Sequence, residues 1–186
     1  ALFLNLTCWN AEEGVEVLCE ERIPADVVAH VAWHHLVAKQ IARTVPGPAC
    51  ADSLFFAESI ASAFDLYLVG RLLRNVPDSD FIATQVSIMG EVAAQAGLPE
   101  AEFAAALDAV AEDPERAFED LRALLFDVSR ALLGCRNGTQ AQRALEGFAA
   151  HRFESLLHHY QLSNWVLSAR AYAVSAPAQE QLVRAV

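Results

Sequence analysis

The sequence predicts an all-α fold, and three observations support this prediction. Hydrophobic residues make up 54% of the 186-residue chain and charged residues 20%, so the chain can bury enough apolar surface to fold as a single domain over residues 1–186. Ala is frequent, whereas β-branched residues are scattered and do not alternate, which favours helix over sheet. Gly and Pro are few and stand at the ends of periodic segments. We therefore expect a compact bundle of six or seven helices.

Three helices are predicted in the first half of the chain, where prolines and glycines mark their ends. Their approximate bounds are Pro24–Thr44, Ala51–Arg74 and Asp80–Ala96. Asp78 or Ser79 is the expected N-cap of the third helix, and Gly97 its expected stop. The first 22 residues are ambiguous, because Leu2 to Leu6 alternate as in a strand, whereas the following residues allow a helical turn or two.

The second half is predicted to hold three more helices. Pro99 opens one that extends to about Ala111. Asp113 is the expected N-cap of the next, which runs from Pro114 to about Leu133. After a turn at 137–138, one long helix is predicted from about Thr139 to Val174, with Gly147 as its internal breaker.

The helix over 51–74 is expected to be the central one. Its apolar side chains cover nearly the whole helical circumference, which is typical of a helix that is buried on all sides. We expect its most buried residues to be Phe56, Ile60, Phe64 and Leu68. Glu58, Ser62 and Asp65 form a polar stripe on this otherwise apolar helix, and buried carboxylates require partners.

Charge and composition argue against several classes of partner. The formal net charge is −11 and the arginines are dispersed, so we expect no binding of nucleic acid. Neither a basic signal sequence nor an uninterrupted apolar run of about 18–20 residues stands out, so we expect a cytoplasmic protein that does not enter the membrane. The four cysteines form no Cys-x-x-Cys pair, which argues against a zinc ribbon.

Histidines on two other predicted helices could be partners of the acidic stripe. His30 and His34 are four residues apart and share a face with apolar residues, and His151 and His158 share a face of the long C-terminal helix. These imidazoles and the two carboxylates could meet in the core as ligands of iron or manganese. The hypothesis is a metal-dependent, oxygen-using oxidoreductase with six candidate ligands: His30, His34, Glu58, Asp65, His151 and His158.

Other interpretations remain open, and one is that the same residues form a metal-free acid–base or ligand pocket. Glu-x-x-His, which marks ferritin-like di-iron proteins, is absent from the sequence, and histidines on apolar faces are commonly hydrogen-bonded core residues. Without a diagnostic catalytic motif, the chain could be a non-catalytic helical protein. It would then bind a partner protein, a second copy of itself or a small apolar ligand.

Overall fold

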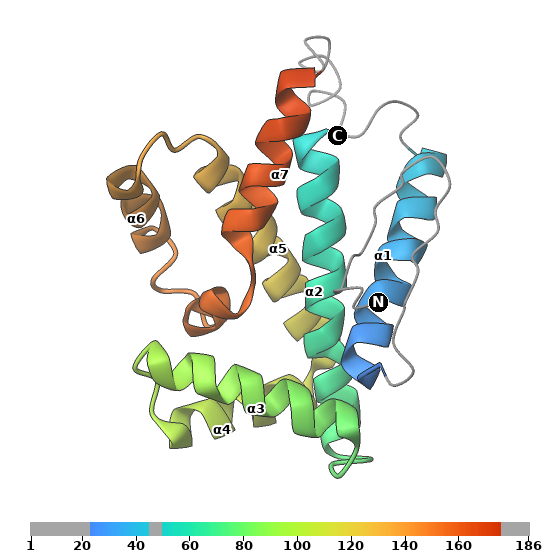
Figure 1. Cartoon of the computed structure of the whole chain (residues 1–186). Coiled ribbons are helices and arrows are strands. Elements are labelled where there is room, and N and C mark those ends of the chain that lie inside the picture. The colour runs from blue at the N-terminus through green and yellow to red at the C-terminus, as the bar shows by residue number, and fades with distance from the viewer. Residues whose placement is uncertain (1–22, 45–49, 176–186) are drawn as a thin grey trace, which may run out of the picture.

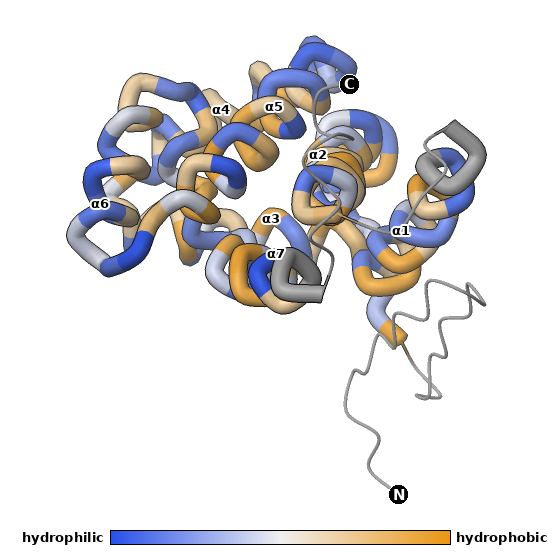
Figure 2. The backbone as a smooth tube through the Cα atoms, turned by 90° about the horizontal axis from the view of Figure 1, so that it is seen from above, coloured by the Kyte–Doolittle hydropathy of each residue, from blue (hydrophilic) through white to orange (hydrophobic). Residues whose placement is uncertain are grey.

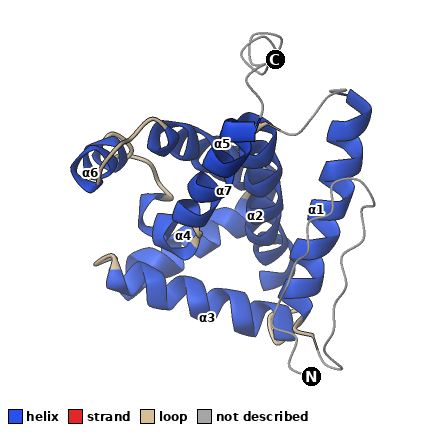
Figure 3. Ribbon diagram, turned by 45° about the horizontal axis from the view of Figure 1, so that its top comes forward, coloured by secondary structure: helices blue, strands red, loops and turns tan. Residues whose placement is uncertain are grey.

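A computed structural model describes residues 23–44 and 50–175, and all of its regular elements are helical (Figure 3). Helix accounts for 81% of this part of the chain, and no strand occurs in it. The all-α prediction is therefore confirmed. The residues from Leu2 to Leu6, where a strand remained open, lie outside the described residues.

Seven α-helices and one 3₁₀-helix, η1, follow one another along the described chain. Their bounds are α1 Ala25–Thr44, α2 Ala51–Leu73, α3 Asp80–Gln95, α4 Glu100–Glu112, α5 Pro114–Leu133, α6 Gly138–Glu146, η1 Glu154–His159 and α7 Leu162–Ser175. The ends of α1 to α5 agree with the predicted ends to within one residue, because Pro, Gly and capping residues fix them locally.

The predicted capping residues form the expected contacts. The Ser79 hydroxyl accepts a hydrogen bond from the backbone N–H of Ile82 at 3.4 Å, and the Asp113 carboxylate accepts one from the N–H of Arg116 at 3.0 Å. Each satisfies a donor that the first helical turn leaves open. Gly97 follows α3 with a φ of 86°, the left-handed conformation that only glycine adopts without strain.

Helix α2 occupies the centre of the fold, as predicted. It packs against α1, α3, α4, α5 and α7, most extensively against α5, and Figure 1 shows α1 on one of its sides and α5 and α7 on the other. The expectation that no segment is long and apolar enough to cross a membrane was wrong for this helix. By length and composition alone α2 could cross a membrane. However, 56% of its most apolar 18-residue segment is buried by the other elements, as in a core helix.

The face that α2 buries differs from the predicted one. Phe56 is 38% exposed, and Ile60, Phe64 and Leu68 are only partly buried. The fully buried side chains include instead Phe55, Ala57, Ala61, Ala63, Leu66 and Val69. Because apolar residues surround this helix, the sequence pattern does not select one face, and the small residues lie where neighbouring helices approach most closely.

The helix predicted over 139–174, with a kink or break allowed at Gly147, is broken there and does not continue as one element. The structure has α6, a series of turns, η1 and α7 in its place. Helix α6 ends at Gly147 and buries none of its residues, and it lies at the outer edge of the bundle with mostly hydrophilic residues (Figure 2). The turns and η1 bring Phe153, Leu156, Leu157 and Tyr160 into the core. One straight helix could not place both this segment and α7 against the bundle.

Candidate metal centre

A polar seam runs between α1 and α2 through an otherwise apolar contact. Asp26, His30 and His34 are four residues apart on α1 and therefore share one face of that helix. Going from His30 to His34 along α1, the partners on α2 change from Asp65 back to Glu58. The two helices are thus antiparallel here, and each turn of α1 brings one histidine to a carboxylate of α2.

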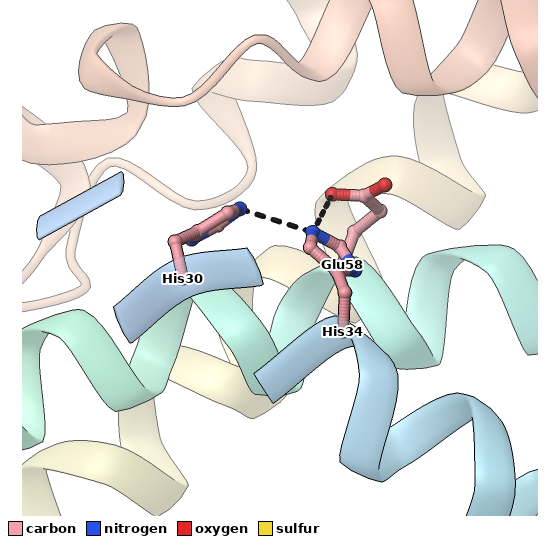
Figure 4. Close-up of side chains that lie close together, drawn as sticks. All are labelled: His30, His34 and Glu58. Carbon is pink, nitrogen blue, oxygen red and sulfur yellow. Dashed lines mark hydrogen bonds and ion pairs between the residues drawn. The ribbon is translucent and has the colours of Figure 1, made fainter. Parts of the chain in front are cut away.

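Three ligand atoms converge in this seam. The Nε2 atoms of His30 and His34 are 3.0 Å apart, and His34 Nε2 lies 3.5 Å from Glu58 Oε2. Figure 4 shows the two imidazoles and the Glu58 carboxylate turned toward one another. All three ligand atoms lie within 4.8 Å of one another. The structure thus brings together three of the six residues that the sequence analysis named as candidate ligands.

Asp65 fixes the orientation of the His30 ring. His30 Nδ1 lies 2.7 Å from Asp65 Oδ2, a short distance typical of a charge-assisted hydrogen bond. In the tautomer with its proton on Nδ1, His30 donates a hydrogen bond to the carboxylate, and its Nε2 lone pair is directed toward His34. A carboxylate on the far nitrogen of a ligating histidine is the usual supporting contact in metal centres.

Burial sets the protonation state of His34. The side chain is 5% exposed, and burial, together with the charge of His30, lowers the pKa of His34 to about 4. His34 is therefore neutral at physiological pH. A neutral imidazole is the form that binds metal ions.

The Asp65 carboxyl responds to opposing influences. Burial raises the pKa of Asp65 above its ordinary value, and the charge of Asp26 adds to this, while the hydrogen bond and the charge of His30 act against it. Burial has the larger effect because a low-dielectric environment disfavours the charged form.

Some residues in or near the seam were not among the predicted ligands. Asp26 shares a face of α1 with His30 and His34. Burial lowers the pKa of His159, and the charge of His30 adds to this. Burial also raises the pKa of the Tyr160 phenol, with a smaller contribution from the charge of Asp65. Both residues stand at the end of η1, and their placement depends on the turns after Gly147, a break whose extent the sequence does not indicate.

The structure does not bring the other two predicted ligands into this group. His158 is exposed, and the Nδ1 atom of His151 accepts a hydrogen bond from the backbone N–H of Phe153 at 3.2 Å. Among the described residues, His30, His34 and Glu58 form the group with converging ligand atoms. The alignment of His151 with His158 assumed one continuous α-helix, and the break at Gly147 removes it.

Two of the three separations between the ligand atoms match those around a single metal ion. With metal–ligand bonds of about 2.1 Å, two ligand atoms on one ion are about 3.0 Å apart at an angle of 90° and about 3.4 Å apart at a tetrahedral angle. The separations of 3.0 Å between His30 and His34 and 3.5 Å between His34 and Glu58 lie near these values. The three atoms together span up to 4.8 Å, so His30 and Glu58 would have to move closer to each other to bind the same ion.

Comparison with protein-family models, with curated proteins and with solved structures finds no match to this chain. The functional argument therefore rests on the geometry of the seam.

Proposed function

We propose that His30, His34 and Glu58 bind one divalent transition-metal ion, and that the protein is a metal-dependent oxidoreductase of the mononuclear iron type. The observation that carries the proposal is the convergence of two imidazole nitrogens and one carboxylate oxygen within 4.8 Å. Asp65 supports it by holding the His30 ring with Nε2 toward the other two ligands.

Three protein ligands leave coordination positions for other molecules. Two histidines and one carboxylate with open positions are the ligand set of oxygen-activating non-haem iron proteins, and manganese accepts the same donors. Such an ion would supply redox chemistry at the open positions. The chain itself would fix the ligands on two packed helices, keep His34 neutral, and surround the site with apolar residues from α1 and α2.

A second candidate is a non-catalytic protein in which the seam is a hydrogen-bonded core. The separation of 3.0 Å between the two histidine nitrogens is itself a hydrogen-bond distance, so the four side chains could also stabilise one another without an ion. In that case the function would lie on the surface, for example on the outer face of α1, where Val28 and Leu36 are 45% and 53% exposed.

Metal analysis separates the two candidates. We expect protein purified without chelators to hold about one equivalent of iron or manganese, measured by elemental mass spectrometry. His34→Ala and Glu58→Ala should lose the metal because each removes a ligand, whereas His158→Ala should keep it, since His158 is exposed. Circular dichroism of each variant, compared with the wild-type spectrum, establishes that it remains folded.

The redox class has its own test. Nitric oxide, an analogue of dioxygen, should bind the Fe²⁺-loaded wild-type protein and give a new electron paramagnetic resonance signal, because open positions are available. If only zinc binds, the metal site stands and the oxidoreductase assignment is wrong. If no metal binds, or if the folded His34→Ala variant keeps its metal, the core network is the correct interpretation.

A further inference from the structure

A second group of polar atoms lies beside the candidate metal centre. It consists of four oxygen atoms from four parts of the chain: Asp26 Oδ1 on α1, Asp65 Oδ1 on α2, Gln85 Oε1 on α3 and the Tyr160 hydroxyl after η1. Among the described residues, none of these buried atoms has a hydrogen-bond partner. Each of the four residues is more than nine-tenths buried. A buried polar atom without a partner costs about 1–3 kcal/mol, so four together call for a ligand.

Hydrogen bonds and helix packing link these residues to the seam. The Gln85 amide donates a hydrogen bond to Asp26 Oδ2 at 3.0 Å, which joins α3 to α1. Asp26 stands one helical turn before His30 on α1, and His30 Nδ1 lies 2.7 Å from Asp65 Oδ2. Helix α3 also packs against η1, which Tyr160 follows. Asp65 touches the candidate metal centre through His30.

The atoms of this group are almost all hydrogen-bond acceptors without donors. Three of the four atoms can only accept hydrogen bonds or coordinate a cation, because they belong to two carboxylates and an amide carbonyl. No Lys or Arg in the described part of the chain forms an ion pair with Asp26 or Asp65, and the ion pair of Asp65 is with His30. The positive end of the α1 helix dipole favours the Asp26 charge, but Oδ1 still has no donor.

We propose that the oxygens of Asp26, Asp65, Gln85 and Tyr160 form a second cation site next to the candidate metal centre. Carboxylate and amide oxygens are the ligands that hard cations such as Mn²⁺, Mg²⁺ and Ca²⁺ prefer. A protonated amino group of a small molecule carries the same charge and three donors, and it would meet the same acceptors. The site is distinct from the first because it has no imidazole ligand.

The test uses the full chain, freed of metal by a chelator and then titrated with Mn²⁺ while the bound ion is counted. We expect two Mn²⁺ per chain in the wild type. Asp26→Asn, which keeps the shape and removes the charge, should weaken one of the two sites by about tenfold or more because ligand charge sets affinity. His34→Ala should lose the other site and keep this one, so failure of this inference and failure of the proposed function are distinguishable.

A second experiment tests whether the site binds a protonated amine in place of a metal ion. Methylammonium is added to protein already loaded with one equivalent of Mn²⁺, and methanol serves as its uncharged control. A rise in unfolding temperature with methylammonium alone, absent in Asp26→Asn, indicates an amine site. The Asp52→Asn variant is the matched control, because Asp52 is partly exposed, belongs to neither site and pairs with Arg130 at 3.3 Å. The inference is overturned if the wild type binds at most one Mn²⁺ and responds to methylammonium no more than Asp26→Asn does.

Discussion

The Nδ1 atom of His30 lies 2.7 Å from Oδ2 of Asp65 and couples α1 to the central helix. The contact has two consequences. It pairs a buried carboxylate, whose desolvation would otherwise be unfavourable, and it leaves the opposite nitrogen of the ring directed at His34 and Glu58. Asp65 is thus a positioning residue, and its effect can be separated from that of the ligands.

Replacing Asp65 with Asn should weaken metal binding while leaving all three proposed ligands in place. Asparagine has the same shape but accepts the His30 proton less strongly, so the ring is held less firmly and its Nε2 is a weaker base. Loss of such a supporting contact typically lowers metal affinity by about 10–100-fold. Competition with a coloured chelator measures the change, and Asp52→Asn is the surface control. Unchanged affinity in Asp65→Asn would show that the Asp65–His30 contact has no part in metal binding.

Adjacent phenylalanines on α2 should differ sharply in their effect on stability. Phe55 is fully buried against Val166 and Ala169 of α7, and truncation to Ala should lower the free energy of unfolding by about 3–5 kcal/mol. Phe56 is 38% exposed, so Phe56→Ala should cost about 1 kcal/mol or less. Urea denaturation measures both. A larger loss for Phe56 would reverse the assigned orientation of α2.

The orientation of Phe55 and Phe56 could not be predicted from the sequence, whereas the ends of the helices could. Helix ends were predictable because Pro, Gly and capping side chains act within one turn, as Ser79 and Asp113 do. The buried face of α2 was not predictable, because apolar residues occur on all its sides. Its orientation is decided by small residues that allow neighbouring helices to approach, and this information lies in the partner helices.

Only the part of the candidate site that lies on α1 and α2 could be predicted from the sequence. His30, His34, Glu58 and Asp65 were found because regular four- and three-residue spacings in α1 and α2 place them on single faces. The rest of the predicted site fell on the segment that forms the turns and η1, whose sequence keeps the apolar spacing of an α-helix. That spacing suggested His151 and His158, neither of which joins the group of converging ligand atoms.

Acid should destabilise the metal-free protein through His34. Its pKa is about 4 in the folded protein and about 6.5 in the unfolded chain, so the unfolded state binds more protons between these values. The free energy of unfolding should therefore fall as the pH is lowered from about 6.5 to 4, by up to about 3 kcal/mol. Denaturant titration at several pH values, with a chelator present, measures the slope.

The His34→Gln variant is the control for this pH dependence. It removes the titrating group and keeps a polar side chain, so the difference in stability from the wild type should change over this pH range and become constant above about pH 7.5. Asp65 contributes in the opposite sense, because its raised pKa makes the folded state bind more protons than the unfolded state. Since Asp65 is present in both proteins, the comparison isolates His34. A difference that is independent of pH would show that His34 is not buried.

Gly70 should be intolerant of any side chain, because α2 and α4 approach each other at this point. A Cβ atom on residue 70 would lie 2.7 Å from the carbonyl oxygen of Val110 and 3.1 Å from its Cγ1. Ala is the better helix former by about 1 kcal/mol, but this clash involves backbone and should separate the helices. We therefore expect Gly70→Ala to lower the free energy of unfolding by about 1–3 kcal/mol.

Gly134 is the matched control, since its φ is −73° and the nearest contact of an added Cβ atom would be an ordinary 3.6 Å. Gly134→Ala should be neutral or slightly stabilising. Thermal or urea unfolding of both variants decides the matter, and equal stabilities within about 0.5 kcal/mol would contradict the close approach of α2 and α4, since surface changes typically fall in that range.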